Sequence, residues 1–157
     1  VDVAKPWNQF EVTLDDGMPT WTQDGITVDA LKFYVGIKDG SLLAPTPKEP
    51  KGAAPIAFKA NMQAADVVVL FEKLYSRGGS TFTLAKVEPT TFVGVPGYRF
   101  EFGSIRKSDD VRLSGVGWVA VRDGELWAIT FTAPRLAFFP AGIGSAEAIA
   151  RSARIKA

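Results

Sequence analysis

Side chains that could carry out chemistry are scarce in this sequence, because its 157 residues include no histidine and no cysteine. Without histidine there is no imidazole base near neutral pH, and without cysteine there is no thiolate nucleophile. The usual ligands of zinc and copper are missing as well. We therefore expect neither enzyme activity nor a cofactor or metal site.

Carboxylates are the groups that remain best suited to acid–base chemistry. Two adjacent pairs, Asp15-Asp16 and Asp109-Asp110, both lie in expected turns. Asp is favoured in turns because its side chain hydrogen-bonds to the nearby backbone. Hydrolysis of the glycosidase type instead requires two carboxylates that face each other across a cleft. A carboxylate-based hydrolase therefore remains one alternative function.

Basic residues gather around the polar segment 104–110, which is expected to join two strands. Arg106 and Arg112 belong to this cluster, and Asp109 and Asp110 lie within it. The mixed charges indicate a solvated loop, and docking of an acidic partner is the alternative. The whole sequence has a formal net charge of +1, so no long-range field favours nucleic acid as a partner.

The elements that must position these residues form a single domain over residues 1–157. A composition of 46% hydrophobic and 22% charged residues is typical of a globular chain. The dipeptides Asp24-Gly25 and Asp123-Gly124 predict hairpin turns, and Val95-Pro96-Gly97 predicts another turn. The proline-rich segment 43–57 is expected to be an exposed loop. Alternation of apolar and polar residues predicts strands at 10–14, 31–37, 82–87, 98–102, 112–121 and 126–133.

Two helices are expected, over residues 62–75 with Asn61 as N-cap and over about 145–153 with Ser145 as N-cap. Helices packed on hairpin-linked strands predict an antiparallel sheet, not a parallel nucleotide-binding sheet. Gly115 and Gly117 lie within a strand and not before a helix. They therefore predict close packing or a bulge rather than a dinucleotide site.

The order of segments along the second half of the chain resembles a known family. A helix is followed by Gly78-Gly79, by FVGVPGYRFEF at 92–102, by a hairpin, by VRDGELW at 121–127 and by a last helix ending in IARSARI at 149–155. This order resembles the PsbP-like superfamily, whose members include plant photosystem assembly proteins and a Ran-binding import factor. In particular, it resembles small proteobacterial envelope lipoproteins of unknown function. The likeness covers residues 60–157 well and residues 1–45 loosely.

The resemblance implies an α+β fold in which an antiparallel sheet of about six strands is sandwiched by helices (α/β/α). It also implies a non-catalytic role in which the domain binds an unidentified envelope protein during envelope assembly or maintenance. A lipoprotein would lie in the periplasm or on a membrane of the bacterial envelope. It would contact that membrane only through a lipid anchor upstream of Val1. On this basis we expect a monomer.

One face of the expected sheet mixes aromatic and charged side chains. Lys32 and Tyr34 alternate with apolar neighbours in their strand, Arg99 does so in another, and Trp118 can join them. Tyr, Trp and Arg are enriched in binding hot spots, so these four residues, with Arg106 and Arg112, form the predicted partner site. The alternative is that the C-terminal helix and the first residues cover this face, so that Tyr34 and Trp118 form a second small core.

A small-molecule or lipid carrier is a third possible function. Such a carrier would need a closed apolar cavity of about 300 Å³ or more between sheet and helix. The expected lining residues are Phe82, Tyr98, Phe100, Trp127 and Phe131.

Overall fold

The computed structural model describes residues 1, 7–9, 19–23, 28–43, 56–76, 80–106, 110–136 and 138–155. These residues form one antiparallel sheet of seven strands in the order β1-β2-β3-β7-β6-β5-β4. The strands are β1 (Asn8–Gln9), β2 (Thr20–Thr22), β3 (Ala30–Ile37), β4 (Thr81–Phe92), β5 (Val95–Ile105), β6 (Arg112–Arg122) and β7 (Glu125–Pro134). The helices are α1 (Ala64–Tyr75) and α2 (Phe138–Ser152).

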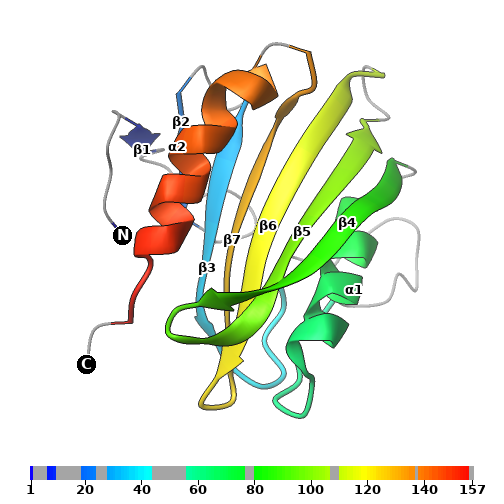
Figure 1. Cartoon of the computed structure of the whole chain (residues 1–157). Helices are drawn as coiled ribbons and strands as arrows, with labels where there is room; N and C mark the ends of the chain where they lie inside the picture. Colours follow the sequence, from blue (N-terminus) through cyan, green and yellow to red (C-terminus); the bar gives the residue numbers. More distant parts are fainter. Residues whose placement is uncertain are drawn as a thin grey trace.

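The two helices lie on opposite faces of the sheet, so the α+β class and the sandwich of helix, sheet and helix are confirmed (Figure 1). Helix α1 packs against β4, β5 and β6, whereas α2 packs against β6 and β7. The sheet has one strand more than the six expected, and β1 and β2 are very short. The predicted strand 10–14 and the Asp24-Gly25 turn lie outside the described residues.

Both helices begin at other residues than the sequence predicted. Helix α1 starts at Ala64 because Gln63, not Asn61, is the N-cap and forms a capping box with Asp66. Helix α2 starts at Phe138, so Ser145 lies in its middle, where it accepts a hydrogen bond from Trp7 Nε1 at 2.9 Å. Proline fits at position 140 because N–H groups in the first turn have no acceptor within the helix.

Two-residue hairpin turns join the long strands. Asp123 and Gly124 have φ angles of 53° and 74°, as a type I′ turn requires, which confirms the prediction for this dipeptide. The turn between β4 and β5 lies at Val93-Gly94, not at Val95-Pro96-Gly97, and Val93 has a φ of 47°. A β-branched residue rarely adopts a positive φ, so the sequence pointed to the Pro-Gly pair instead.

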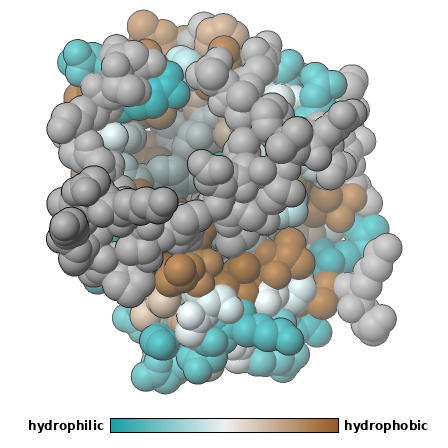
Figure 2. Space-filling model, turned by 180° about the vertical axis from the view of Figure 1, so that it is seen from behind, coloured by the Kyte–Doolittle hydropathy of each residue, from teal (hydrophilic) through white to brown (hydrophobic). Residues whose placement is uncertain are grey.

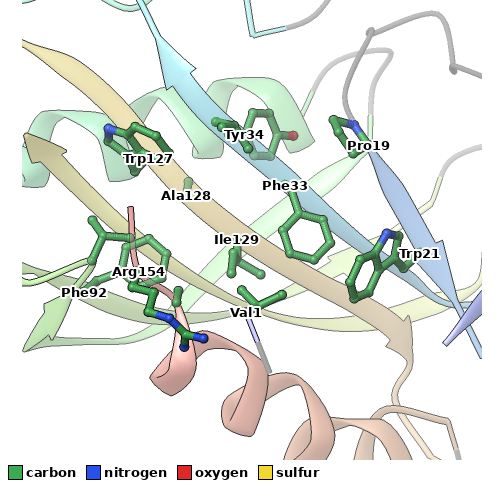
Figure 3. Close-up of a pocket in the computed structure, with 13 residues that line it drawn as sticks. Val1, Pro19, Trp21, Phe33, Tyr34, Phe92, Trp127, Ala128, Ile129 and Arg154 are labelled. Carbon is green, nitrogen blue, oxygen red and sulfur yellow. The ribbon is translucent and has the colours of Figure 1, made fainter. Parts of the chain in front are cut away.

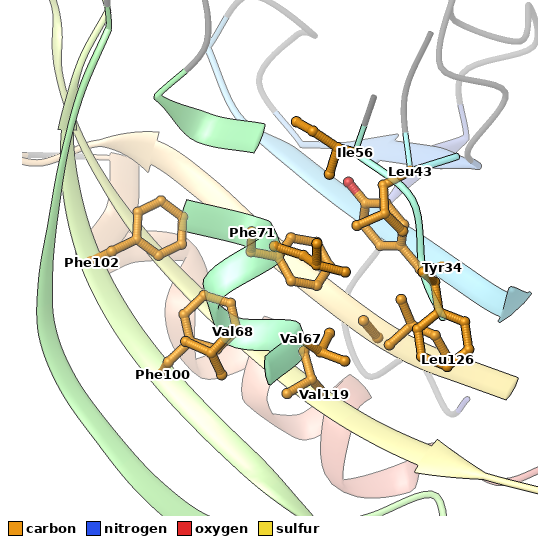
Figure 4. Packing of buried hydrophobic residues seen from close by; sticks show 13 residues of the cluster. Tyr34, Leu43, Ile56, Val67, Val68, Phe71, Phe100, Phe102, Val119 and Leu126 are labelled. Carbon is orange, nitrogen blue, oxygen red and sulfur yellow. The ribbon is translucent and has the colours of Figure 1, made fainter. Parts of the chain in front are cut away.

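The face under α1 is filled by large side chains. Phe71 of α1 lies between the ring of Tyr34, 5.0 Å away, and that of Phe100, 5.9 Å away (Figure 4). Glycines of β6 make room for these rings, because a Cβ on Gly115 would lie 2.1 Å from Phe102 and one on Gly117 would lie 2.4 Å from Phe100. The close packing predicted for these glycines is therefore confirmed.

The outer surface differs between regions. Seen from behind, the described residues show a short band of apolar side chains that is bordered by hydrophilic ones along the lower edge (Figure 2). Among the described residues, no helix is long and apolar enough to cross a membrane.

Candidate functional site

The face under α2 changes from apolar to charged across the sheet. Strand register aligns one residue from each of five strands in a single row: Phe33, Ile129, Trp118, Arg99 and Glu88. Helix α2 lies on this row, because Ile149 shares a core with Ile129 and Trp118 while Glu147 contacts Arg99. Two hollows of different chemistry remain on this face. One lies past the C-terminal end of α2, where Ala153 and Arg154 line it, and the other lies beside α2 at Glu147 and Arg151.

The first hollow is an open apolar groove of about 340 Å³ (Figure 3). The rings of Trp21 and Phe33 lie 4.7 Å apart on its floor, and Arg154 lies at its edge. The other main apolar contributors are Val35, Phe92, Trp127 and Ile129. We call this site the apolar groove.

A bulge in β3 shapes the apolar groove. The register of β3 against β7 shifts between Tyr34 and Ile37, and Gly36 within this bulge has a φ of 57°. Val35 is therefore left 58% exposed in the groove, while Ile37 turns to the core under α1. The sequence had placed Val35 and Ile37 on one face, and this was wrong because alternation resumes out of phase after a bulge.

The second hollow, of about 440 Å³, is charged, and Arg99 lies at its centre. Its guanidinium contacts Glu88 of β4 at 3.2 Å, Glu101 of β5 at 3.2 Å and Glu147 of α2. It also lies 5.9 Å from the ring centre of Trp118, a distance that suits a cation–π contact. Arg99 thus ties the last helix to the edge of the sheet.

Burial and the neighbouring glutamates both affect the pKa of Arg99. Burial disfavours the charged guanidinium and by itself lowers this pKa, but the hydrogen bond to Glu147 and the attraction of Glu101 outweigh it. The pKa of Arg99 is therefore raised above its ordinary value. Because the side chain stays protonated at neutral pH, the three contacts keep their full strength there.

The structure separates the four residues that were predicted to share one mixed face. Tyr34 is only 2% exposed and lies in the core under α1. Lys32 lies on that face too, because it pairs with Thr130, whose hydroxyl accepts a hydrogen bond from Tyr75 of α1. Arg99 and Trp118 lie on the opposite face, under α2.

The prediction of one accessible mixed face is therefore wrong. Trp118 is 5% exposed and belongs to the core under α2, as the alternative prediction had it. Tyr34 does not join it there. The error arose because apolar residues of β3 and β5 were assumed to point the same way, whereas those of β3 face α2 and those of β5 face α1.

The other two predicted residues, Arg106 and Arg112, lie at the end of the sheet where β5 leads to β6. Arg135, which the sequence analysis did not single out, lies beside them because its N–H donates to the Arg112 carbonyl at 3.1 Å. Arg112 and Arg135 line a third hollow of about 290 Å³. Arg135 directly follows β7. Its place beside Arg112 depends on the pairing of β6 with β7, which the sequence does not show.

The predicted lining of a carrier cavity is not found. Phe82, Tyr98 and Phe100 pack in the core under α1, whereas Trp127 and Phe131 pack under α2, so these five residues cannot line one cavity. Of the predicted carboxylate pairs, only Asp110 is described, and it is exposed. Among the described residues there is no group of three or more acidic side chains able to hold a metal ion.

Comparison with known proteins gives a match in structure alone. No protein-family model and no curated protein sequence matches the chain. The structure is similar to the solution structure of cyanobacterial PsbP (CyanoP) from Synechocystis sp. PCC 6803, with a TM-score of 0.59 and 15% identity. The match covers 93% of this chain and 79% of that one.

The fold is PsbP-like. This confirms the architecture that the resemblance implied, while identity of 15% carries no statement about activity or partner.

Proposed function

We propose that this PsbP-like chain is a non-enzymatic extracytoplasmic domain that binds a protein partner in envelope assembly or maintenance. The apolar groove at the C-terminal end of α2 is the observation that carries this proposal. An apolar side chain of the partner, aromatic or aliphatic, would bind there. The location in the periplasm or on an envelope membrane is part of the proposal and rests on the sequence resemblance.

The groove has the composition of a binding site for a protein anchor residue. Aromatic side chains are enriched in interface cores, and Trp21, Phe33 and Trp127 line this groove. Its volume of about 340 Å³ is near the lower end of the range for ligand sites. Because the groove is open, a segment of another protein can reach it directly.

The contacts within the charged hollow favour a structural role for its three glutamates over a catalytic one. Each of the three glutamates around Arg99 contributes an oxygen to the guanidinium. A general acid or base would have to give up such a contact before it could exchange a proton with a substrate.

Affinity capture from a solubilised envelope extract tests the proposal, with Val35→Asp and Val87→Asp as matched variants. Val35 is 58% exposed in the groove, whereas Val87 is 42% exposed on the other face of the edge strand. Both substitutions place a charge on an exposed strand valine. We expect a partner that is retained by Val87→Asp and lost by Val35→Asp. Equal retention by both variants would contradict binding at the groove.

A carrier of small apolar molecules remains the second candidate, because the same groove could hold a ligand of modest size. Native mass spectrometry of the protein purified from its envelope distinguishes the two. A bound molecule that is lost in Val35→Asp, in the absence of any captured protein, would favour the carrier.

A further inference from the structure

One end of the sheet carries cations and exposed apolar side chains together. The C-terminal ends of β5 and β7 and the N-terminal ends of β6 and α2 lie at the top of the sheet in Figure 1. The hydrogen bond between Arg135 N and Arg112 O holds the start of β6 beside the residue that follows β7. We call this region the basic-apolar tip; it comprises Ile105, Arg106, Arg112, Arg135, Leu136 and Phe138.

Two guanidinium groups of the tip, those of Arg112 and Arg135, differ from Arg99 in their surroundings. Among the described residues, neither Arg112 nor Arg135 lies within ion-pair distance of a carboxylate. Both line the same hollow as the hydroxyl-bearing residues Thr81 and Thr83. Asp110 is the acidic residue described in the adjoining connection. This contrasts with Arg99, which contacts three carboxylates.

The apolar members of the tip are unusually accessible. Leu136 is 86% exposed, more than any other large hydrophobic residue among those described, and Ile105 and Phe138 are exposed too. Removal of such a side chain from water is favourable, because the driving force grows with the apolar area that is buried. Leu136 directly follows Arg135 in the chain, so an exposed apolar group and a cationic group lie close together at this end of the sheet.

We propose that the basic-apolar tip docks on a membrane surface that contains anionic phospholipids. The guanidinium groups of Arg112 and Arg135 would bind phosphate oxygens, and Leu136 and Phe138 would enter the interface beside the headgroups. Free phosphate would bind only the arginines. A bilayer would bind the arginines through its headgroups and the leucine and phenylalanine through its apolar interior. This surface is separate from the apolar groove, so the inference goes beyond the proposed function. It also departs from the expectation that the domain meets a membrane only through a lipid anchor.

Sedimentation of the purified chain with vesicles tests the inference. One set of vesicles contains phosphatidylcholine alone, and the other contains equal parts of phosphatidylcholine and phosphatidylglycerol. We expect binding to the anionic set at low salt and weakening as salt is added. Arg112→Gln/Arg135→Gln should lower the partition coefficient about twenty-five-fold, since each basic residue near such a surface contributes about fivefold.

Matched variants separate the tip from general electrostatic and apolar effects. Lys38→Gln/Lys59→Gln removes the same charge from exposed positions outside the tip and should bind as the unchanged chain does. Leu136→Ser should weaken binding several-fold, and Leu42→Ser, at another exposed leucine, should not.

Three results would overturn the inference. The first is no binding to anionic vesicles at millimolar lipid, and the second is equal loss in the tip variants and their controls. The third is complete displacement by inorganic phosphate at constant ionic strength, which would assign the two arginines to a free anion. Normal vesicle binding by Val35→Asp would show that this test does not depend on the apolar groove.

Discussion

The two faces of one sheet are packed differently in this protein. Under α1, the rings of Phe71, Phe100 and Phe102 form a continuous packed core. On the face of α2, large aromatic side chains such as Trp21 and Trp127 remain partly exposed and line an open groove past the C-terminal end of the helix. The comparison shows how a small domain can pack one face of its sheet fully and still leave apolar surface accessible on the other.

The size of the helix side chains explains the difference. Helix α1 buries Val67, Val68, Leu70 and Phe71, which fill the space above the sheet. Helix α2 buries mostly small residues, and a Cβ on Gly142 would lie 2.5 Å from Phe131. Small side chains let a helix approach the sheet closely but cover little area on either side of it.

Removal of a large side chain under α1 should have the greatest effect. We expect Phe71→Ala to lower the free energy of unfolding by about 4 kcal/mol, because it leaves a cavity among several rings. Urea denaturation followed by circular dichroism measures this. Trp21→Ala, which widens a groove already open to water, should cost far less. Equal losses of unfolding free energy in the two variants would contradict the difference in packing between the two faces.

Addition of one methyl group to β6 should have the next largest effect. Gly115→Ala is expected to destabilise by about 2 kcal/mol, because its Cβ would meet the Phe102 ring. Phe102→Leu in the same chain should relieve part of this clash. A double-mutant cycle with a stabilising coupling energy supports the steric account, and additive effects would refute it.

Loss of the central cation in the charged hollow should come third. Arg99→Met is expected to cost about 2 kcal/mol, since it leaves three glutamates close together without a counter-charge. Arg151→Met changes an exposed residue of the same hollow and should alter unfolding little. Thermal unfolding of both variants makes the comparison, and similar midpoints would show that Arg99 does not hold α2 in place.

The smallest effect on stability is expected in the apolar groove. Val35→Asp and Val87→Asp should each change the free energy of unfolding by less than about 1 kcal/mol, because both valines are exposed strand residues. Their unfolding curves should nearly coincide while partner capture differs. A large selective loss of stability in Val35→Asp would mean that Val35 supports the fold rather than binding.

Local patterns in the sequence determined much of the fold. Alternation assigned Trp127, Ile129 and Phe131 to one face of β7, and the structure confirms it. The Asp123-Gly124 turn and the tight packing at Gly115 were predictable as well, because each depends on the conformation or size of a single glycine.

Relations between strands were decided only by tertiary structure. Alternation shows which residues of one strand share a face. It does not show which face of the next strand lies on the same side of the sheet, so Tyr34 was wrongly grouped with Arg99. The bulge that exposes Val35 and the pairing that brings Arg135 beside Arg112 depend on partners distant in the chain. The sequence therefore determined the elements and the class of fold, whereas strand register and helix placement, which arise from long-range packing, decided where a partner could bind.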